Sequence, residues 1–374
     1  MEHMEGGKQV SANELLTMRT ETIGVGQFSR VRLVEVKQLR KYLETLLPPE
    51  EAGKEPTIAD PPEVSMGVFA LKVMKKTEVV RLKQVEHVKA EADILARVSH
   101  PFIVNLYHRF QDERNLYLIE EFVQNGSLGT HVRKNRQLPN DTARFYAAQV
   151  VMAIQFLHSE HIIYRDLNPE NVMLDRGHYV KLIDFGLAKG LNLDDPTART
   201  WTLCGTPEYV APEVIASKGH SKEVDWWALG IVIFEMLAGY PPWYNIKSHA
   251  VYNDVIKEQP DTPQHFDPHV KELIKKLLIK ERTKRIGSSK NGAEDIKKHK
   301  WYRGLNWAAL YNKQMAPPLD GVNDVPYITS TCDIKQFDPY PTSSEESGPL
   351  LEVSRDASLF GSWESGTSSG AGKH

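Results

Sequence analysis

Several residues of this chain could hold and transfer a phosphoryl group. The run GVGQFSRV, residues 24–31, sets two glycines between strand-like segments, where backbone N–H groups can approach phosphate oxygens without a Cβ in the way. A plain turn between two strands explains the run equally well. Lys72, in the middle of the strand-like ALKV, needs an anionic partner if it is buried, and Glu91 is a candidate. The alternative is an edge-strand lysine that points to solvent.

Three further motifs follow in chain order, and they supply the other parts that phosphoryl transfer requires. The chemistry calls for a clamp on the triphosphate, bound metal ions, an oriented hydroxyl and neutralisation of the developing charge. The carboxylates and the asparagine in these motifs offer the oxygen ligands that suit Mg²⁺. The motifs are YRDLNPEN at 164–171, LIDFG at 182–186 and CGTPEYVAPE at 204–213.

The hydrophobic pattern predicts the elements that position these residues. A strand-rich part precedes a helix-rich part, and between the first strands an insertion at 37–66 combines a short helical run with a loop rich in proline and acids. The final stretch, from Ser362 onward, is too polar and glycine-rich to pack, so we expect it to be disordered. Expected strands lie within 23–36, 67–74 and 102–122, and expected helices at 85–98, 142–159, 224–237 and 270–279.

Composition limits the class of protein. With 374 residues, 41% of them hydrophobic and 25% charged, the chain has the balance of a globular protein. A net charge of −3 argues against a nucleic-acid partner. Two cysteines, no signal peptide and Glu2 in place of a myristoylated glycine predict a cytoplasmic protein, with the nucleus left open. The most apolar stretch, 226–238, is too short for a bilayer, so we expect a buried helix and no membrane insertion.

In this order the motifs resemble the eukaryotic protein kinase family over residues 17–302. The resemblance implies an α+β, two-lobed protein kinase fold that transfers the γ-phosphate of ATP to Ser or Thr with Mg²⁺. The small β-rich N-lobe would span 17–120, including the insertion, and the larger helical C-lobe 121–302, with a hinge near 121–123. An AGC-type C-terminal tail would follow at 303–374.

The resemblance also assigns roles, residue by residue. Asp166 would accept or orient the hydroxyl proton, Asn171 and Asp184 would bind Mg²⁺, and Lys72, paired with Glu91, would hold the α- and β-phosphates. Glu213 would pair with Arg285, and Asp225 would brace the catalytic loop. For each of these, a surface salt bridge or a helix cap is the plainer alternative. The expected ATP-contacting residues are Gly24, Val25, Gly26, Gln27, Phe28, Ser29, Val31, Ala70, Lys72, Glu121, Val123, Met173 and Phe337.

Longer segments resemble the AGC group and, within it, the catalytic subunits of cyclic-AMP-dependent protein kinase. These are LKQVEHV at 82–88, RTWTLCGTPEYVAPE at 199–213, GHSKEVDWWALG at 219–230, TKRIG at 283–287 and FDPYP at 337–341. The resemblance implies that a phosphate on Thr202 is held by nearby cations and that the tail wraps back over the small lobe. The expected cations are His87, Arg165 and Lys189.

The same resemblance names partners. Glu170 and Glu235 match a pair that reads an arginine two residues before the phosphoacceptor, so protein substrates with basic residues are expected. Trp201, Lys218 and Arg133 match positions where a cyclic-nucleotide-binding regulatory subunit docks, although a core tryptophan is an alternative for Trp201. In the tail, Ser354 is a candidate phosphosite or a plain exposed serine.

Four positions depart from the family pattern. Asn168 stands where the family has a lysine that contacts the γ-phosphate, and loss of that charge could lower turnover by roughly 10²-fold. Ser29 replaces a glycine, which is tolerable if its φ is negative. Glu120 falls behind the adenine pocket, where the family has an apolar residue, and Ser127 replaces a glutamate that reads an arginine three residues before the phosphoacceptor.

Two other functions stay open at this point. A kinase-fold scaffold that binds nucleotide and a regulatory partner, with weak or no activity, is suggested by Asn168, Ser127 and Glu120. A kinase of small molecules is disfavoured by the long activation segment and by the acidic pair Glu170 and Glu235.

Overall fold

The computed structural model describes residues 16–36, 68–195, 197–243, 252, 255–256, 259–322, 334–337, 340 and 350–363. The predicted insertion at 37–66 and the end of the chain from residue 364 lie outside them. The chain divides into two compact units, one built from residues 1–85, 106–122 and 329–367, the other from 86–105, 123–328 and 368–374. One boundary between the two units lies between residues 122 and 123, within the hinge predicted at 121–123. Among the described helices, none is both long and apolar enough to cross a bilayer.

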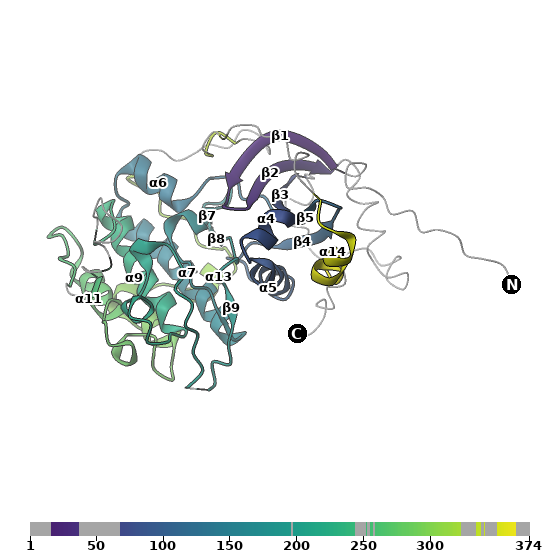
Figure 1. Cartoon of the computed structure of the whole chain (residues 1–374). Helices are drawn as coiled ribbons and strands as arrows, with labels where there is room; N and C mark the ends of the chain where they lie inside the picture. Colours follow the sequence, from purple (N-terminus) through teal and green to yellow (C-terminus); the bar gives the residue numbers. More distant parts are fainter. Residues whose placement is uncertain are drawn as a thin grey trace. The chain divides into compact units, whose positions relative to one another are not determined.

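The first unit is a five-stranded antiparallel sheet with the strand order β1-β2-β3-β5-β4 (Figure 1). The expected strands are confirmed, because β-branched and aromatic residues alternate along them. Two helices, α4 and α14, complete the unit. The bounds are β1 Leu16–Val25, β2 Ser29–Val36, β3 Val68–Lys75, α4 Lys76–Arg81, β4 Leu106–Gln111, β5 Asn115–Glu121 and α14 Val353–Phe360.

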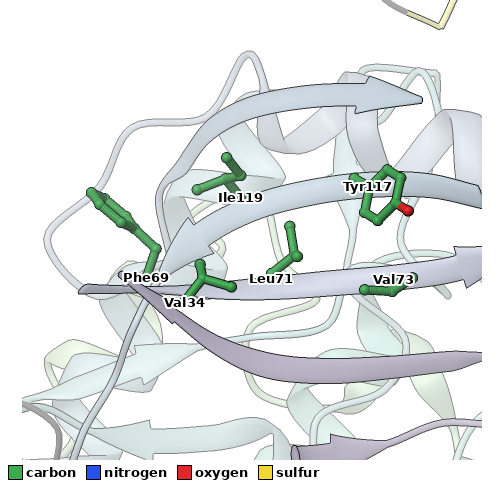
Figure 2. Close-up of a cluster of buried hydrophobic side chains, with 6 residues drawn as sticks. All are labelled: Val34, Phe69, Leu71, Val73, Tyr117 and Ile119. Carbon is green, nitrogen blue, oxygen red and sulfur yellow. The ribbon is translucent and has the colours of Figure 1, made fainter. Parts of the chain in front are cut away.

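Each face of this sheet buries its own cluster of side chains. Figure 2 shows the first cluster, in which alternate residues of β2, β3 and β5 point to one side. The second cluster lies on the other face around Ala70, and Phe337 of the tail packs against it. The Phe337 ring stacks on Phe122 with 5.7 Å between ring centroids, so this part of the tail wraps back over the sheet as predicted. The first cluster consists of Val34, Phe69, Leu71, Val73, Tyr117 and Ile119.

The tail also packs through α14, against β4 and α4. Phe360 is fully buried, and the indole N–H of Trp363 donates to the carbonyl of Phe110 at 2.8 Å. The guanidinium of Arg109 lies 5.7 Å from the centre of the Trp363 ring, a cation–π contact. The prediction that the stretch from Ser362 cannot pack is therefore wrong at Trp363, because one large aromatic side chain anchors an otherwise polar segment.

The second unit is mainly helical, and its longer helices occur where the hydrophobic pattern predicted helices. Its central helices are α7 and α9, and α9 is the buried apolar helix expected at 226–238, with Trp226 and Trp227 fully buried. The helices are α5 Val85–Leu95, α6 Leu128–Asn135, α7 Asn140–Ser159, α8 Pro212–Ile215, α9 Glu223–Ala238, α11 Pro268–Leu277, α12 Ala293–Lys297 and α13 Trp307–Tyr311.

Short strands and 3-10 turns of the second unit carry the motif residues. β7 and β8 form an antiparallel pair, and β6 pairs with β9. Their register places the residue before β7 beside the residue after β8, which sets the geometry of the candidate site. The bounds are β6 Ile162–Ile163, η1 Pro169–Asn171, β7 Val172–Leu174, β8 Val180–Leu182, β9 Lys189–Gly190, η2 Pro207–Tyr209, η3 Arg282–Lys284 and η4 Lys300–Tyr302.

Candidate functional site

The glycine-containing run 24–31 forms the turn that joins β1 to β2. The N–H of Gly26 donates to the carbonyl of Ser29 at 2.8 Å and closes the turn, while Val25, Gly26 and Gln27 are exposed. A Cβ on Gly26 would lie only 2.5 Å from the Ser29 hydroxyl oxygen. Ser29 has a negative φ, so its replacement of glycine costs no backbone strain, as anticipated. The residues at the tip of the turn are therefore exposed.

Lys72 lies in the central strand β3, opposite Val31 on one side and Leu118 on the other. Its side chain is buried, with 8% of the residue exposed, so the alternative of a solvent-facing lysine on an edge strand is wrong. A buried ammonium requires anionic partners. Glu91, its predicted partner, is buried in α5 with 1% exposed, and their pairing stays a prediction.

Glu120 is buried on the same face of the sheet as Ala70. The register pairs Ala70 directly with Glu120 and Phe69 with Glu121. Residues directly opposite in neighbouring strands project to the same face. Glu120 therefore faces the side that carries Phe337, away from the cluster of Figure 2.

Asp166 is held by donors from its own loop, the motif at 164–171, and from Thr206 in the motif at 204–213. Its Oδ2 accepts from Asn171 Nδ2 at 2.8 Å. Its Oδ1 accepts from Thr206 twice, from the backbone N–H at 3.1 Å and from the hydroxyl at 3.0 Å. Burial raises the pKa of Asp166, the charge of Asp184 adds to the rise, and the hydrogen bonds oppose it. The result is a fixed carboxylate with a strengthened affinity for protons.

Asn168 has a structural role in this loop. Its Oδ1 caps η1 by accepting from the N–H groups of Glu170 at 3.0 Å and Asn171 at 3.2 Å. Its Nδ2 donates to the Asp166 carbonyl and to the Thr206 hydroxyl, both at 3.1 Å. Both amide hydrogens are thus engaged within the protein, and Asn168 is 4% exposed. In this conformation it ties the loop to Thr206 instead of offering a donor to a phosphate.

Asn171 and Asp184 are brought together by the pairing of β7 with β8. The N–H of Ile183 donates to the carbonyl of Asn171 at 3.0 Å, just beyond the Val172–Leu182 pair. Asp184 is exposed, has a positive φ of 54°, and accepts from the N–H of Gly186 at 3.2 Å. Because Asn171 donates to Asp166 through its nitrogen, its oxygen is left as the end that can ligate a cation.

These two residues fit Mg²⁺ better than a metal that needs an all-protein cage. Within the described ranges, no group of three or more His, Cys, Asp or Glu side chains is placed to hold a metal ion. Mg²⁺ is commonly bound by one or two protein oxygens together with water and substrate phosphates. One carboxylate and one amide oxygen are such a set.

Asp225 braces the catalytic loop from α9. It is 1% exposed and accepts from the N–H groups of Tyr164 at 3.0 Å and Arg165 at 2.8 Å. His158 also lies 2.8 Å from Asp225 and stacks edge-on against Trp226. Arg165 has a positive φ of 68°, a conformation that costs free energy in a non-glycine residue and that these hydrogen bonds stabilise.

Glu213 and Arg285 form a buried, two-pronged ion pair. Arg285 Nη1 and Nη2 donate to the two carboxylate oxygens at 2.7 and 2.9 Å. Arg285 also donates to the Glu223 carbonyl at 2.7 Å and lies 5.1 Å from the ring centre of Trp227. The pair is therefore not the surface salt bridge of the plainer alternative, because both side chains are almost fully buried.

The three cations that were predicted near Thr202 come from different parts of the chain: Lys189 from β9, Arg165 from the motif at 164–171 and His87 from α5. Thr202 is exposed, and Lys189 donates to the hydroxyl of Thr200 at 3.1 Å. Arg165 donates through Nε to the Leu187 carbonyl at 2.6 Å, and its buried Nη1 has no hydrogen-bond partner among the described residues. His87 lies in α5 at an intermediate exposure. An unsatisfied guanidinium N–H near the segment is what an added phosphate would satisfy.

The predicted acidic pair consists of Glu235, near the C-terminal end of α9, and Glu170, in η1. Glu235 accepts a hydrogen bond from the hydroxyl of Tyr209, and burial, followed by the charge of Glu170, raises the pKa of Glu235. Glu170 forms an ion pair with Arg133 and accepts from the hydroxyl of Ser127 at 2.7 Å. Ser127 also accepts from the N–H of Thr130 and so caps α6.

The remaining predicted residues lie as follows. Val123 and Met173 are buried in the second unit, Trp201 is 65% exposed, which excludes the core alternative, Lys218 is exposed, and Ser354 is exposed on α14. Sequence reasoning missed Thr206, Tyr209 and His158. The first two lie within the quoted motif CGTPEYVAPE, which could have marked them, whereas His158 stands out only once the fold places it beside Asp225.

Comparison with known proteins gives consistent matches. Residues 63–302 match the model of the protein kinase domain. The chain is 44% identical over 340 residues to the human cAMP-dependent protein kinase catalytic subunit PRKX, covering 91% of this chain and 84% of that one. It is 42% identical to cAMP-dependent protein kinase catalytic subunit 3 of Drosophila melanogaster, and 47% identical to the Dictyostelium discoideum catalytic subunit. These two matches cover 91% and 77% of this chain, but 52% and 44% of those longer proteins.

Proposed function

Because this chain belongs to the protein kinase family, we propose that Asp166 is the residue at which it transfers the γ-phosphoryl group of ATP to a protein hydroxyl. The observation that carries the assignment is the setting of this carboxylate. Asn171 and Thr206 hold it with three hydrogen bonds, and Asp184, a candidate Mg²⁺ ligand, contributes to its raised pKa. A fixed carboxylate beside a metal-binding residue is what in-line transfer requires.

The chain is a protein serine/threonine kinase that uses ATP and Mg²⁺. The substrate hydroxyl oxygen attacks the γ-phosphorus, the bond to the β,γ-bridging oxygen breaks, and ADP leaves with that electron pair. The hydroxyl proton passes to Asp166, whose raised pKa makes it a better acceptor than an ordinary aspartate. Mg²⁺, when bound, neutralises charge on the phosphates. Asn171 and Asp184 would supply its protein oxygens, and Lys72 would contact the α- and β-phosphates.

The proposed substrates are proteins with basic residues near the phosphoacceptor. The support is the acidic pair Glu170 and Glu235: burial raises the pKa of Glu235, and the negative charge of Glu170 adds to the rise. An added cation beside two neighbouring carboxylates is favourable. How strongly an arginine is preferred depends on the groups that already contact Glu170.

A cyclic-nucleotide-binding regulatory subunit is the proposed partner. Trp201 and Leu203 expose 65% and 57% of their surface on the activation segment, and exposed aromatic residues are frequent interface anchors. Gly219 has a positive φ of 70°, and a Cβ there would lie 2.9 Å from the indole nitrogen of Trp201. Lys218, next to it, is exposed and adds a positive charge.

The scaffold alternative is not favoured. It was suggested by Asn168, Ser127 and Glu120. The similar proteins, however, are named catalytic subunits, and the sequence contains Asp166, Asn171 and Asp184. Asn168 is accommodated as a cap and a link to Thr206, so its presence does not disrupt the loop.

The test is transfer of labelled γ-phosphate from ATP to serine, threonine and tyrosine versions of one basic peptide, with and without Mg²⁺. The wild type should label the first two and require the metal. Asp184→Ala should abolish transfer, whereas Asp195→Ala, a control in the exposed part of the activation segment, should not. Preferred labelling of tyrosine, or unchanged transfer by Asp184→Ala, would contradict the proposal.

A further inference from the structure

Glu170 is already satisfied by side chains of the protein itself. One carboxylate oxygen accepts from the Ser127 hydroxyl at 2.7 Å, and the other is paired with the guanidinium of Arg133. Arg133 is held in turn by Thr130, whose hydroxyl accepts from its Nη2 at 3.1 Å. Both oxygens of the Glu170 carboxylate therefore have partners within the protein before any substrate arrives.

The first turn of α6 is shaped to receive this carboxylate. Ser127 supplies the hydroxyl while its own oxygen caps the helix at Thr130 N, 3.0 Å away. Gly129 supplies the room, because a Cβ at this position would overlap the nearer carboxylate oxygen and lie 2.7 Å from Glu170 Cδ. Gly129 has no positive φ, so the backbone conformation alone does not require a glycine here. A larger residue at this position would instead make the Glu170 carboxylate, the movable end of a side chain, shift away.

We propose that Arg133 is a specificity-determining residue that competes, within the protein, with a substrate arginine for Glu170. This inference rests on the proposed function and on the substrate-reading role of Glu170 and Glu235. A substrate guanidinium presents the same planar donors as Arg133, so it must displace Arg133 to bind Glu170. The preference for an arginine over a neutral residue at this position is consequently reduced.

The expected size of the effect follows from exposure. The side chains of Arg133 and Glu170 are 57% and 54% exposed, so solvent screens their interaction. An exposed ion pair of this kind changes an equilibrium constant by roughly two- to fivefold. Removal of the internal competitor should strengthen arginine binding by about that factor.

The experiment compares two serine peptides that differ only in arginine or its neutral isostere citrulline, two residues before the serine. Dissociation constants come from fluorescence anisotropy, and KM and kcat from phosphate transfer. In Arg133→Ala and in Gly129→Ala, the dissociation constant and KM for the arginine peptide should fall about two- to fivefold, with the citrulline peptide and kcat unchanged. Gly129→Ala removes no charge and favours the helix, so it tests displacement of Glu170 separately.

Lys134→Ala is the matched control, because it removes the same charge from an exposed neighbour on α6. It should leave the selectivity at its wild-type value, and Glu170→Gln should abolish the gain made by Arg133→Ala. The inference would be overturned if Arg133→Ala changed the dissociation constants of both peptides equally, or if it weakened the binding of the arginine peptide. Because binding is measured directly, absent phosphate transfer would refute the proposed function while the binding pattern still decides the role of Arg133.

Discussion

Thr206→Val should raise the pKa of Asp166 and shift the acidic limb of the activity profile to higher pH. The hydroxyl of Thr206 donates to Asp166 Oδ1 at 3.0 Å, and this hydrogen bond stabilises the ionised form. Valine has nearly the same shape but no hydroxyl, while the backbone N–H at 3.1 Å and Asn171 at 2.8 Å remain. A hydrogen bond to a charged group is worth about 1.5–3 kcal/mol, which corresponds to about one to two pKa units.

The sign follows from the role of Asp166. Its carboxylate must be ionised to accept the hydroxyl proton, so activity falls as pH falls through its pKa. A higher pKa therefore moves that fall to higher pH. The assay is kcat/KM for a basic serine peptide as a function of pH. Thr206→Ser, which keeps the hydroxyl, should behave like the wild type, and an acidic limb in Thr206→Val that stays in place or moves to lower pH would refute the reasoning.

Three further perturbations test other parts of the structure. Arg285→Ala should lower the free energy of unfolding by about 3–5 kcal/mol in chemical denaturation, because Glu213 would be left buried and unpaired; a loss typical of a surface pair would contradict this. Asn168→Lys should raise kcat by up to about 100-fold, by adding a cation beside the transferred phosphoryl group, and lower stability by about 0.5–2 kcal/mol through loss of the cap. An unchanged kcat of Asn168→Lys in steady-state kinetics would show that the missing positive charge does not limit turnover. Trp363→Ala should release α14 and speed the hydrogen exchange of its backbone amides. Trp363→Phe should keep α14 docked, at a cost of about 1 kcal/mol for the lost hydrogen bond to Phe110. Equal exchange rates in both variants would contradict the role of Trp363 as an anchor.

Much of the fold followed from local pattern. The long helices α7 and α9 were predictable because both come from long, largely apolar segments. The strands were predictable because apolar residues at alternate positions face one cluster. Helix α14 was missed, since its single fully buried residue within the helix, Phe360, gives no periodic signal. Its packing depends on Lys76 and Phe110, more than 200 residues away in sequence, and such contacts are not visible in a local window.

In the candidate site, too, some features could be predicted from the sequence and others could not. Asp166, Asn171 and Asp184 were identifiable from motifs because their roles require particular residue types at fixed spacing. The hydrogen bonds of Asn168 could not be predicted, because the sequence shows only that a positive charge is missing at this position. Its links to Thr206 and to η1 depend on where the activation segment lies against the catalytic loop, which is a property of tertiary structure.

The most direct test of the central claim is phosphate transfer and nucleotide binding by Asp166→Ala. Transfer from Mg·ATP to a serine peptide should fall by about 10²- to 10⁴-fold, while the dissociation constant for a fluorescent ATP analogue and the near-UV circular dichroism stay at wild-type values. Transfer at the wild-type rate by this variant would contradict the account.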